Sequence, residues 1–244
     1  GIERVTMVAC GTAFYACLTA KYWFEKLARI PVEVDIASEF RYREPPVTAG
    51  TMALFVSQSG ETADTLAALR YCRGKADHIV SVTNVAQSSI ARESDLTLPI
   101  YAGVEIGVAS TKAFTCQLTV LLIMALSAAQ QRGKLDAQDS KQLLANLQGL
   151  PGIFNAAMAN TPQITSVASE VAKARDVLFL GRDFMYPLAL EGALKLKEIS
   201  YIHAEAYASG ELKHGPIALV DERVPVVVLA PSDRLFDKSV SNMQ

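Results

Sequence analysis

The residues Ala53-Leu-Phe-Val-Ser-Gln-Ser-Gly-Glu-Thr-Ala-Asp-Thr65 are the most informative part of the chain. Residues 51–56 are a short apolar run bounded by turn signals, which is typical of a buried strand. Residues 62–70 follow with Leu66 and Leu69 spaced for one buried helix face. Small polar residues separate the two segments. The sequence therefore predicts a strand that ends in a polar loop and leads directly into a helix.

The loop at residues 57–62 has the chemistry of an anion site. The backbone N–H groups of a first helical turn point outward, and the helix dipole favours negative charge there. Ser57, Ser59 and Thr62 add hydroxyl donors and Gln58 adds an amide, whereas the loop contains no Lys or Arg. A phosphate here would be held mainly by neutral donors. The alternative is that these hydroxyls are ordinary helix caps.

Strands and helices alternate on both sides of this loop. The expected strands are residues 5–10, 32–36, 51–56, 78–83 and 96–100, and the expected helices are 11–28, 62–70, 88–92 and 111–131. This alternation predicts an α/β fold with a parallel sheet flanked by helices, in which ligands bind beyond the carboxyl ends of the strands. Thr12 and Ser57 lie at such ends and can face one pocket. Residues 37–43 show no clear pattern.

The second half is expected to repeat this architecture incompletely. Residues 136–175 predict helices broken near Pro151 and Pro162, and strands are expected at 177–180 and 224–230. We therefore divide the chain into a first α/β domain at 1–132, a helical connector at 133–175 and the start of a second domain at 176–244. The sequence begins directly before a strand and stops inside an apparent helix from residue 233, so we expect a longer natural chain.

Composition narrows the class of protein. The net charge is −2, with 20% charged and 50% hydrophobic residues, which argues against a nucleic-acid or anionic-membrane partner. The most apolar run, residues 118–129, is too short to span a bilayer and predicts a buried helix. The four cysteines form no C-x-x-C pair and have no His at metal spacing, so we expect reduced thiols in a cytoplasmic protein without metal or cofactor.

A second candidate site lies on the helix expected after Pro187. Glu191, Lys195 and Glu198 fall at i, i+4 and i+7, along one side of that helix. A buried row of this kind with a histidine nearby, such as His214, can move protons between carbon and oxygen atoms. An exposed helix with ordinary salt bridges is the commoner source of the same spacing.

Several of these motifs together resemble a known family, the isomerase half of the glutamine–fructose-6-phosphate aminotransferases, also called glucosamine-6-phosphate synthases. The resemblance runs nearly end to end. Its main stretches are Cys10-Gly-Thr12, Ser57-Gln-Ser-Gly-Glu-Thr-Ala-Asp-Thr65, Glu105-Ile-Gly-Val-Ala-Ser-Thr-Lys-Ala-Phe114, and Leu190-Glu-Gly-Ala-Leu-Lys-Leu-Lys-Glu-Ile-Ser-Tyr-Ile-His-Ala-Glu-Ala-Tyr207.

The resemblance implies two tandem sugar-isomerase (SIS) domains in a homodimer. It implies fructose 6-phosphate as substrate, glucosamine 6-phosphate as product, and ammonia delivered from a separate glutaminase domain; glucose 6-phosphate is a further expected ligand. The residues that it implies for the phosphate are Thr12, Ser57, Gln58, Ser59 and Thr62. Those that it implies for the sugar are Val108 and Ser110.

The family also implies catalytic roles. Glu198 matches the base that moves a proton between C1 and C2 of the sugar, and Lys195 and Glu191 sit beside it. His214 matches the histidine that helps to open the sugar ring, contributed across the dimer interface. Ala13 departs from the usual Ser of the family, which removes a hydroxyl that contributes about 1 kcal/mol.

Two other departures bear on activity. The glutaminase domain is absent from the sequence, and so is the C-terminal tail with the lysine that forms a Schiff base with the open sugar. The sequence therefore predicts weak sugar-phosphate binding and no activity of this chain alone. Two alternatives remain: a stand-alone SIS isomerase or deglycase, and a non-catalytic SIS module that senses a sugar phosphate.

Overall fold

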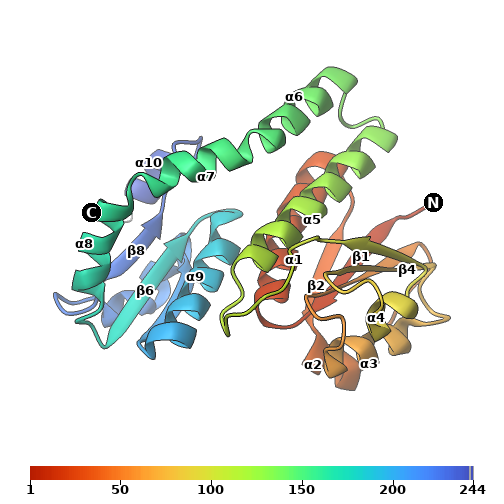
Figure 1. Ribbon diagram of the computed structural model, residues 1–244, viewed down its shortest axis with the longest axis horizontal. Helices are drawn as coiled ribbons and strands as arrows, with labels where there is room; N and C mark the ends of the chain where they lie inside the picture. Colours follow the sequence, from red (N-terminus) through yellow and green to blue (C-terminus); the bar gives the residue numbers. More distant parts are fainter. Residues whose placement is uncertain (242, 244) are drawn as a thin grey trace. The chain divides into compact units, whose positions relative to one another are not determined.

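The computed structural model describes residues 1–241 and 243. The chain divides into two compact units, Gly1–Ala137 and Gln138–Gln244 (Figure 1). The division lies within the segment expected to connect the two domains, and it groups most of that segment with the second unit.

The first unit is built on a five-stranded parallel sheet. Its strand order is β2-β1-β3-β4-β5, so β3 lies at the centre, and every residue of β3 is buried. These strands confirm the expected parallel α/β architecture. Their bounds are β1 (Arg4–Ala9), β2 (Val32–Ile36), β3 (Thr51–Ser57), β4 (His78–Thr83) and β5 (Leu96–Pro99).

Helices cover both faces of this sheet. Successive side chains of a strand point to opposite faces, and in β1 Met7 packs into one core whereas Val8 packs into the other. The first core is closed by α1 (Gly11–Trp23), its π-helical continuation Phe24–Ala28 and α5 (Lys112–Gln131), and the second by α2 (Ala37–Arg43), α3 (Ala63–Cys72) and α4 (Ser89–Arg92). Burial on both faces explains why the strands are continuous apolar runs.

The helix α5 is a core helix with an unusual composition. In the described part of the chain it alone is long and apolar enough, at 20 residues, to cross a membrane by length and composition. Its buried residues Ala113, Leu121, Ala125 and Ala129 recur at helical spacing and belong to the first core. This stripe buries one face of α5, as expected. The length argument drawn from residues 118–129 alone does not hold, because the helix extends to 20 residues.

The second unit contains a three-stranded parallel sheet with the order β7-β6-β8. Val177, Ala193 and Ala204 form the centre of its core, where α9 packs on β6 and β7. The expected helical segment forms α6 (Ala137–Gln148), α7 (Leu150–Met158) and α8 (Thr161–Val171), and the remaining elements are β6 (Asp176–Gly181), α9 (Met185–Ser200), β7 (His203–Ala208), β8 (Val226–Leu229) and α10 (Phe236–Val240). Of the helix expected from residue 233 to the end, residues 242 and 244 lie outside the described residues.

Two elements differ from the sequence-based expectation. Residues 37–43, which show no clear pattern, form α2, because Ala37 and Phe40 bury against the second core. The helix ends at Glu44, whose φ of 47° is left-handed, just before two prolines. The strand β7 was not expected either, because its residues alternate Ala with polar side chains instead of forming an apolar run.

Candidate functional site

A cavity of about 220 Å³ opens at the carboxyl ends of β1 and β3. It brings together six of the residues that the sequence nominated, and none of its lining residues is charged. The nominated residues are Thr12, Ser57, Gln58, Ser59, Thr62 and Ser110, and the others are Cys10, Ala13, Val56 and Gln117.

The hydroxyl groups of the loop at residues 57–62 form hydrogen bonds within the loop and stabilise its conformation. The Ser57 Oγ accepts a hydrogen bond from the Gly60 backbone N–H at 3.0 Å and pairs with the Thr62 Oγ1 at 2.9 Å. The Ser59 Oγ accepts from the Glu61 N–H at 3.2 Å. Thr62 occupies the N-cap position of α3, yet its side chain makes no capping bond. These hydroxyls therefore act inside the loop and do not serve as the ordinary cap of α3.

A second helix begins at the same cavity. Cys10 is the N-cap of α1 and contributes no side-chain cap, while Gly11 takes a left-handed φ of 54°. The first turn of α1 supplies Thr12 and Ala13 to the cavity wall, and Ala13 is only 8% exposed. Two helix N-termini with hydroxyls between them provide the backbone donors and the dipole that favour an anion.

The back of the loop rests on the segment after β4. The Gly60 carbonyl accepts a hydrogen bond from the Ile90 N–H at 3.0 Å, and the Gln58 carbonyl accepts from the Asn84 N–H at 3.1 Å. Gly60 has a φ of 66°, and a Cβ there would lie 1.9 Å from the Ser88 Oγ. Glycine is therefore required both for the backbone conformation and for the close contact.

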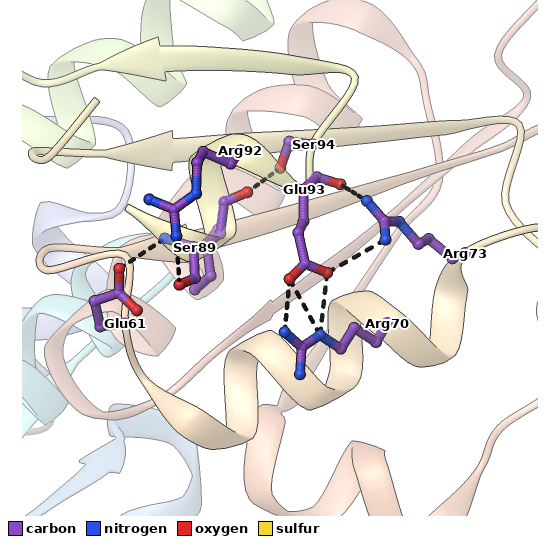
Figure 2. Close-up of polar contacts among 8 residues, drawn as sticks. Glu61, Arg70, Arg73, Ser89, Arg92, Glu93 and Ser94 are labelled. Carbon is purple, nitrogen blue, oxygen red and sulfur yellow. Dashed lines mark hydrogen bonds and ion pairs between the residues drawn. The ribbon is translucent and has the colours of Figure 1, made fainter. Parts of the chain in front are cut away.

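A polar network extends this support across the surface (Figure 2). The Glu61 carboxylate accepts a hydrogen bond from the Ser89 N–H at 2.7 Å, and this bond lowers the pKa of Glu61. The Arg92 guanidinium donates to the Ser89 Oγ at 3.1 Å. Next to it, the ion pair with Arg70 lowers the pKa of Glu93 and joins α4 to α3. Sequence analysis did not identify this network, because its members are separated in the chain.

Val108 does not reach the cavity. Its side chain is 96% exposed and it is not among the lining residues, although Ser110 is. The loop before α5 is held at its base, where Asn84 Nδ2 donates to the Gly103 carbonyl at 2.6 Å and the Ala113 N–H donates to the Glu105 carboxylate at 3.2 Å. The expected contact of Val108 with a sugar therefore stays a prediction.

The Glu–Lys–Glu row forms as expected in the second unit. The Lys195 Nζ lies 3.5 Å from the Glu191 carboxylate and 2.5 Å from the Glu198 carboxylate. Glu191 is 5% exposed, and the side chains of Lys195 and Glu198 are 19% and 30% exposed. The row is thus largely buried, unlike the salt bridges of an exposed helix. His214 lies on a 3₁₀ turn and pairs with Glu211 at 3.1 Å.

Among residues 1–241 and 243, no group of three or more His, Cys, Asp or Glu side chains is placed to hold a metal ion. All four cysteines are free. Burial raises the pKa of the Cys72 thiol to about 11 and raises that of Cys17 as well, so both are poor nucleophiles.

Comparison with known proteins identifies the family to which this chain belongs. The sequence matches the SIS domain over residues 2–127 and 170–242, and the unmatched residues between them include α6 and α7. The chain therefore belongs to the SIS domain family.

Within this family the chain is similar to the C-terminal isomerase region of glutamine–fructose-6-phosphate aminotransferases. It is 62% identical over 243 residues to the enzyme of that name from Bradyrhizobium diazoefficiens and 60% identical to that from Zymomonas mobilis. All of this chain aligns, and it spans 40% of the length of these curated relatives.

Solved structures agree with the sequence comparison. The C-terminal domain of glucosamine-fructose-6-phosphate aminotransferase from Francisella tularensis superposes with a TM-score of 0.97 at 48% identity, covering 100% of this chain and 69% of that one. A putative phosphosugar isomerase from Silicibacter pomeroyi gives a TM-score of 0.84 at 30% identity, covering 99% of this chain and 71% of that one.

Proposed function

We propose that this chain is the sugar-isomerase part of an enzyme that converts fructose 6-phosphate and glutamine-derived ammonia to glucosamine 6-phosphate. The observation that carries the proposal is the uncharged, hydroxyl-lined cavity at two helix N-termini, in a chain 62% identical to an aminotransferase whose name specifies fructose 6-phosphate. A phosphate is the anion that such a cavity suits.

In this proposal the cavity holds the phosphate end of the sugar. Backbone N–H groups of α1 and α3 point at the phosphate oxygens, and side-chain donors complete the shell. Ser110 and Val108 line the sugar, so the loop that contains Val108 must move toward the cavity on binding. The phosphate donors are Thr12, Ser57, Gln58, Ser59 and Thr62.

The row in the second unit performs the proton transfer. Glu198 acts as the base that moves a proton between C1 and C2, and the Lys195 Nζ lies 2.5 Å from that carboxylate. Glu191 holds Lys195 from the other side. His214 opens the sugar ring from the second subunit of a homodimer. A cytoplasmic location and a glutaminase domain that supplies ammonia complete the proposal.

Binding and turnover test separate parts of this proposal. Calorimetry should show that the chain binds glucose 6-phosphate, weakly in keeping with the sequence-based expectation, and does not bind glucose. In an aminotransferase that contains this chain and a glutaminase domain, Glu198→Gln should lower kcat by roughly 10²–10⁴-fold, the usual contribution of a general base, while glucose 6-phosphate still binds. Unchanged turnover would favour a sensing module, and absence of binding by the unsubstituted chain would refute the site.

A further inference from the structure

A buried glutamine on α5 forms part of the cavity wall. Gln117 lies on α5, is 1% exposed and lines the cavity together with Ser57 and Thr62. Its Oε1 is sealed from solvent and accepts no hydrogen bond. Sequence analysis passed over this residue, although a glutamine in a core-facing stripe with Ala113 and Leu121 is a readable signal.

An apolar residue would fill this position more favourably in the isolated fold. Buried polar atoms in proteins are almost always hydrogen-bonded, and a buried carbonyl without a donor is destabilising. Thr65 Oγ1 on α3 is also buried without a partner, but Thr65 does not line the cavity. Gln117 thus combines an unsatisfied buried group with a place in the cavity wall. Residues kept at a cost to stability mark functional sites.

We propose that Gln117 binds the phosphate-bearing end of the ligand, and this proposal rests on the phosphosugar function proposed above. A side-chain amide carries two donors and one acceptor, and rotation about its last bond exchanges the two ends. With the Nε2 toward the cavity, a phosphate oxygen accepts from it; with the two ends exchanged, a sugar hydroxyl donates to the Oε1. Because the cavity wall carries no charged side chain, a neutral amide contributes a donor without adding a fixed charge.

Two substitutions at this position test the contact by calorimetry with glucose 6-phosphate and with inorganic phosphate. Gln117→Met keeps a similar volume and removes all hydrogen bonding. It should weaken glucose 6-phosphate binding roughly tenfold, as expected for one hydrogen bond to a charged group. The melting temperature of the ligand-free chain should stay equal or rise, because the unsatisfied carbonyl is gone. Gln117→Glu should weaken both ligands by more than about a hundredfold, since a carboxylate would face an anion.

Thr65→Val is the matched control, because it removes the other unsatisfied buried oxygen of this unit away from the cavity. It should leave both affinities unchanged. If Gln117→Met and Gln117→Glu bind as the unsubstituted chain does, or if Gln117→Met melts at a lower temperature, Gln117 is a structural residue and the inference is wrong. If the unsubstituted chain itself binds neither ligand, the proposed function fails and the inference fails with it.

Discussion

The cavity of the first unit and the Glu–Lys–Glu row of the second unit differ in the kind of polar group that they contain. The cavity of the first unit is lined by hydroxyls, amides and helix N-termini and by no charged side chain. The row in the second unit consists of two carboxylates around one ammonium. Fixed neutral dipoles suit the recognition of an anion, because they need no counter-ion of their own. A largely buried row of acidic and basic side chains suits proton transfer, because its members can exchange a proton with a substrate.

Substitution in the charged row should lower the free energy of unfolding more than substitution in the cavity. Lys195→Met removes the cation between Glu191 and Glu198 and leaves two carboxylates facing each other. Loss of one partner from a buried ion pair is strongly destabilising, and for this partly exposed row we expect about 2–3 kcal/mol in the free energy of unfolding. Denaturant unfolding measures the loss, with Lys173→Met, an exposed i,i+3 pair with Glu170, as the control.

This substitution also tests whether the two regions are independent. Inorganic phosphate binding to the cavity should be unaffected by Lys195→Met wherever the protein remains folded. A parallel loss of phosphate affinity would contradict the separation of recognition and chemistry.

Gly60→Ala should disturb the backbone of the loop that lines the cavity. The new Cβ would lie 1.9 Å from the Ser88 Oγ, at a φ of 66° that alanine tolerates poorly. We expect a destabilisation of about 1–3 kcal/mol and loss of phosphate binding, measured by thermal melting and calorimetry. Gly74→Ala is the matched control, because Gly74 has a φ of 71° but open space around it, so it should leave phosphate binding intact.

Glu61→Gln removes the carboxylate that links the loop to Ser89. It should lower the stability of the fold by a smaller amount, and this amount should depend on pH. The hydrogen bond from the Ser89 N–H lowers the pKa of Glu61 in the folded state below its ordinary value of 4.5. The ionised carboxylate therefore stabilises the fold above pH 4.5, and this contribution disappears as the pH falls through the lower folded pKa. The melting temperatures of the two proteins should differ at pH 7, and the difference should shrink as the pH falls below 4.5 and through the lowered folded pKa of Glu61.

Glu222→Gln, at an exposed carboxylate of the second unit, is the control for this comparison. A difference between the Glu61→Gln variant and the unsubstituted chain that grows on acidification would show that the bond from Ser89 does not support the loop.

Ala13→Ser should produce the smallest effect of these substitutions, a modest change in ligand affinity. It tests whether an additional neutral donor in the cavity strengthens anion binding. Ala13 is nearly buried in the cavity wall, so a serine there adds one hydroxyl without changing charge. A net hydrogen bond of about 0.5–1.5 kcal/mol corresponds to roughly 2–10-fold tighter binding of glucose 6-phosphate. Weaker binding would mean that the extra oxygen crowds the cavity instead of serving it.

Local physical chemistry accounts for what could be predicted. The strand β3, the loop that follows it and the helix α3 were expected because apolar runs, turn residues and helical spacing are encoded over a few neighbours. The row from Glu191 to Glu198 was expected for the same reason, since residues at i and i+4 share one helix face in any helix.

Elements that depend on distant partners could not be predicted in this way. The helix α2 and the strand β7 have weak local patterns and form because the second core and β6, respectively, bury them. The close approach of Ser88 to Gly60 joins residues 28 positions apart, and no spacing rule reveals it. The roles proposed for Val108 and His214 involve a ligand and a second subunit, and local sequence patterns do not specify either.

The amino-acid order thus contained the alternation of strands and helices, the hydroxyl-rich loop and the spacing of the acid–base row, because each arises from contacts within one or two turns of chain. The meeting of Thr12 and Ser57 in one pocket was expected from the strand ends. Only the tertiary structure showed that Ser110 joins them in the same cavity, and that Gln117 lines it with an unsatisfied carbonyl. The physical reason is that the parallel sheet brings the ends of separate strands to one edge, and this convergence follows from packing between segments that lie far apart in the chain.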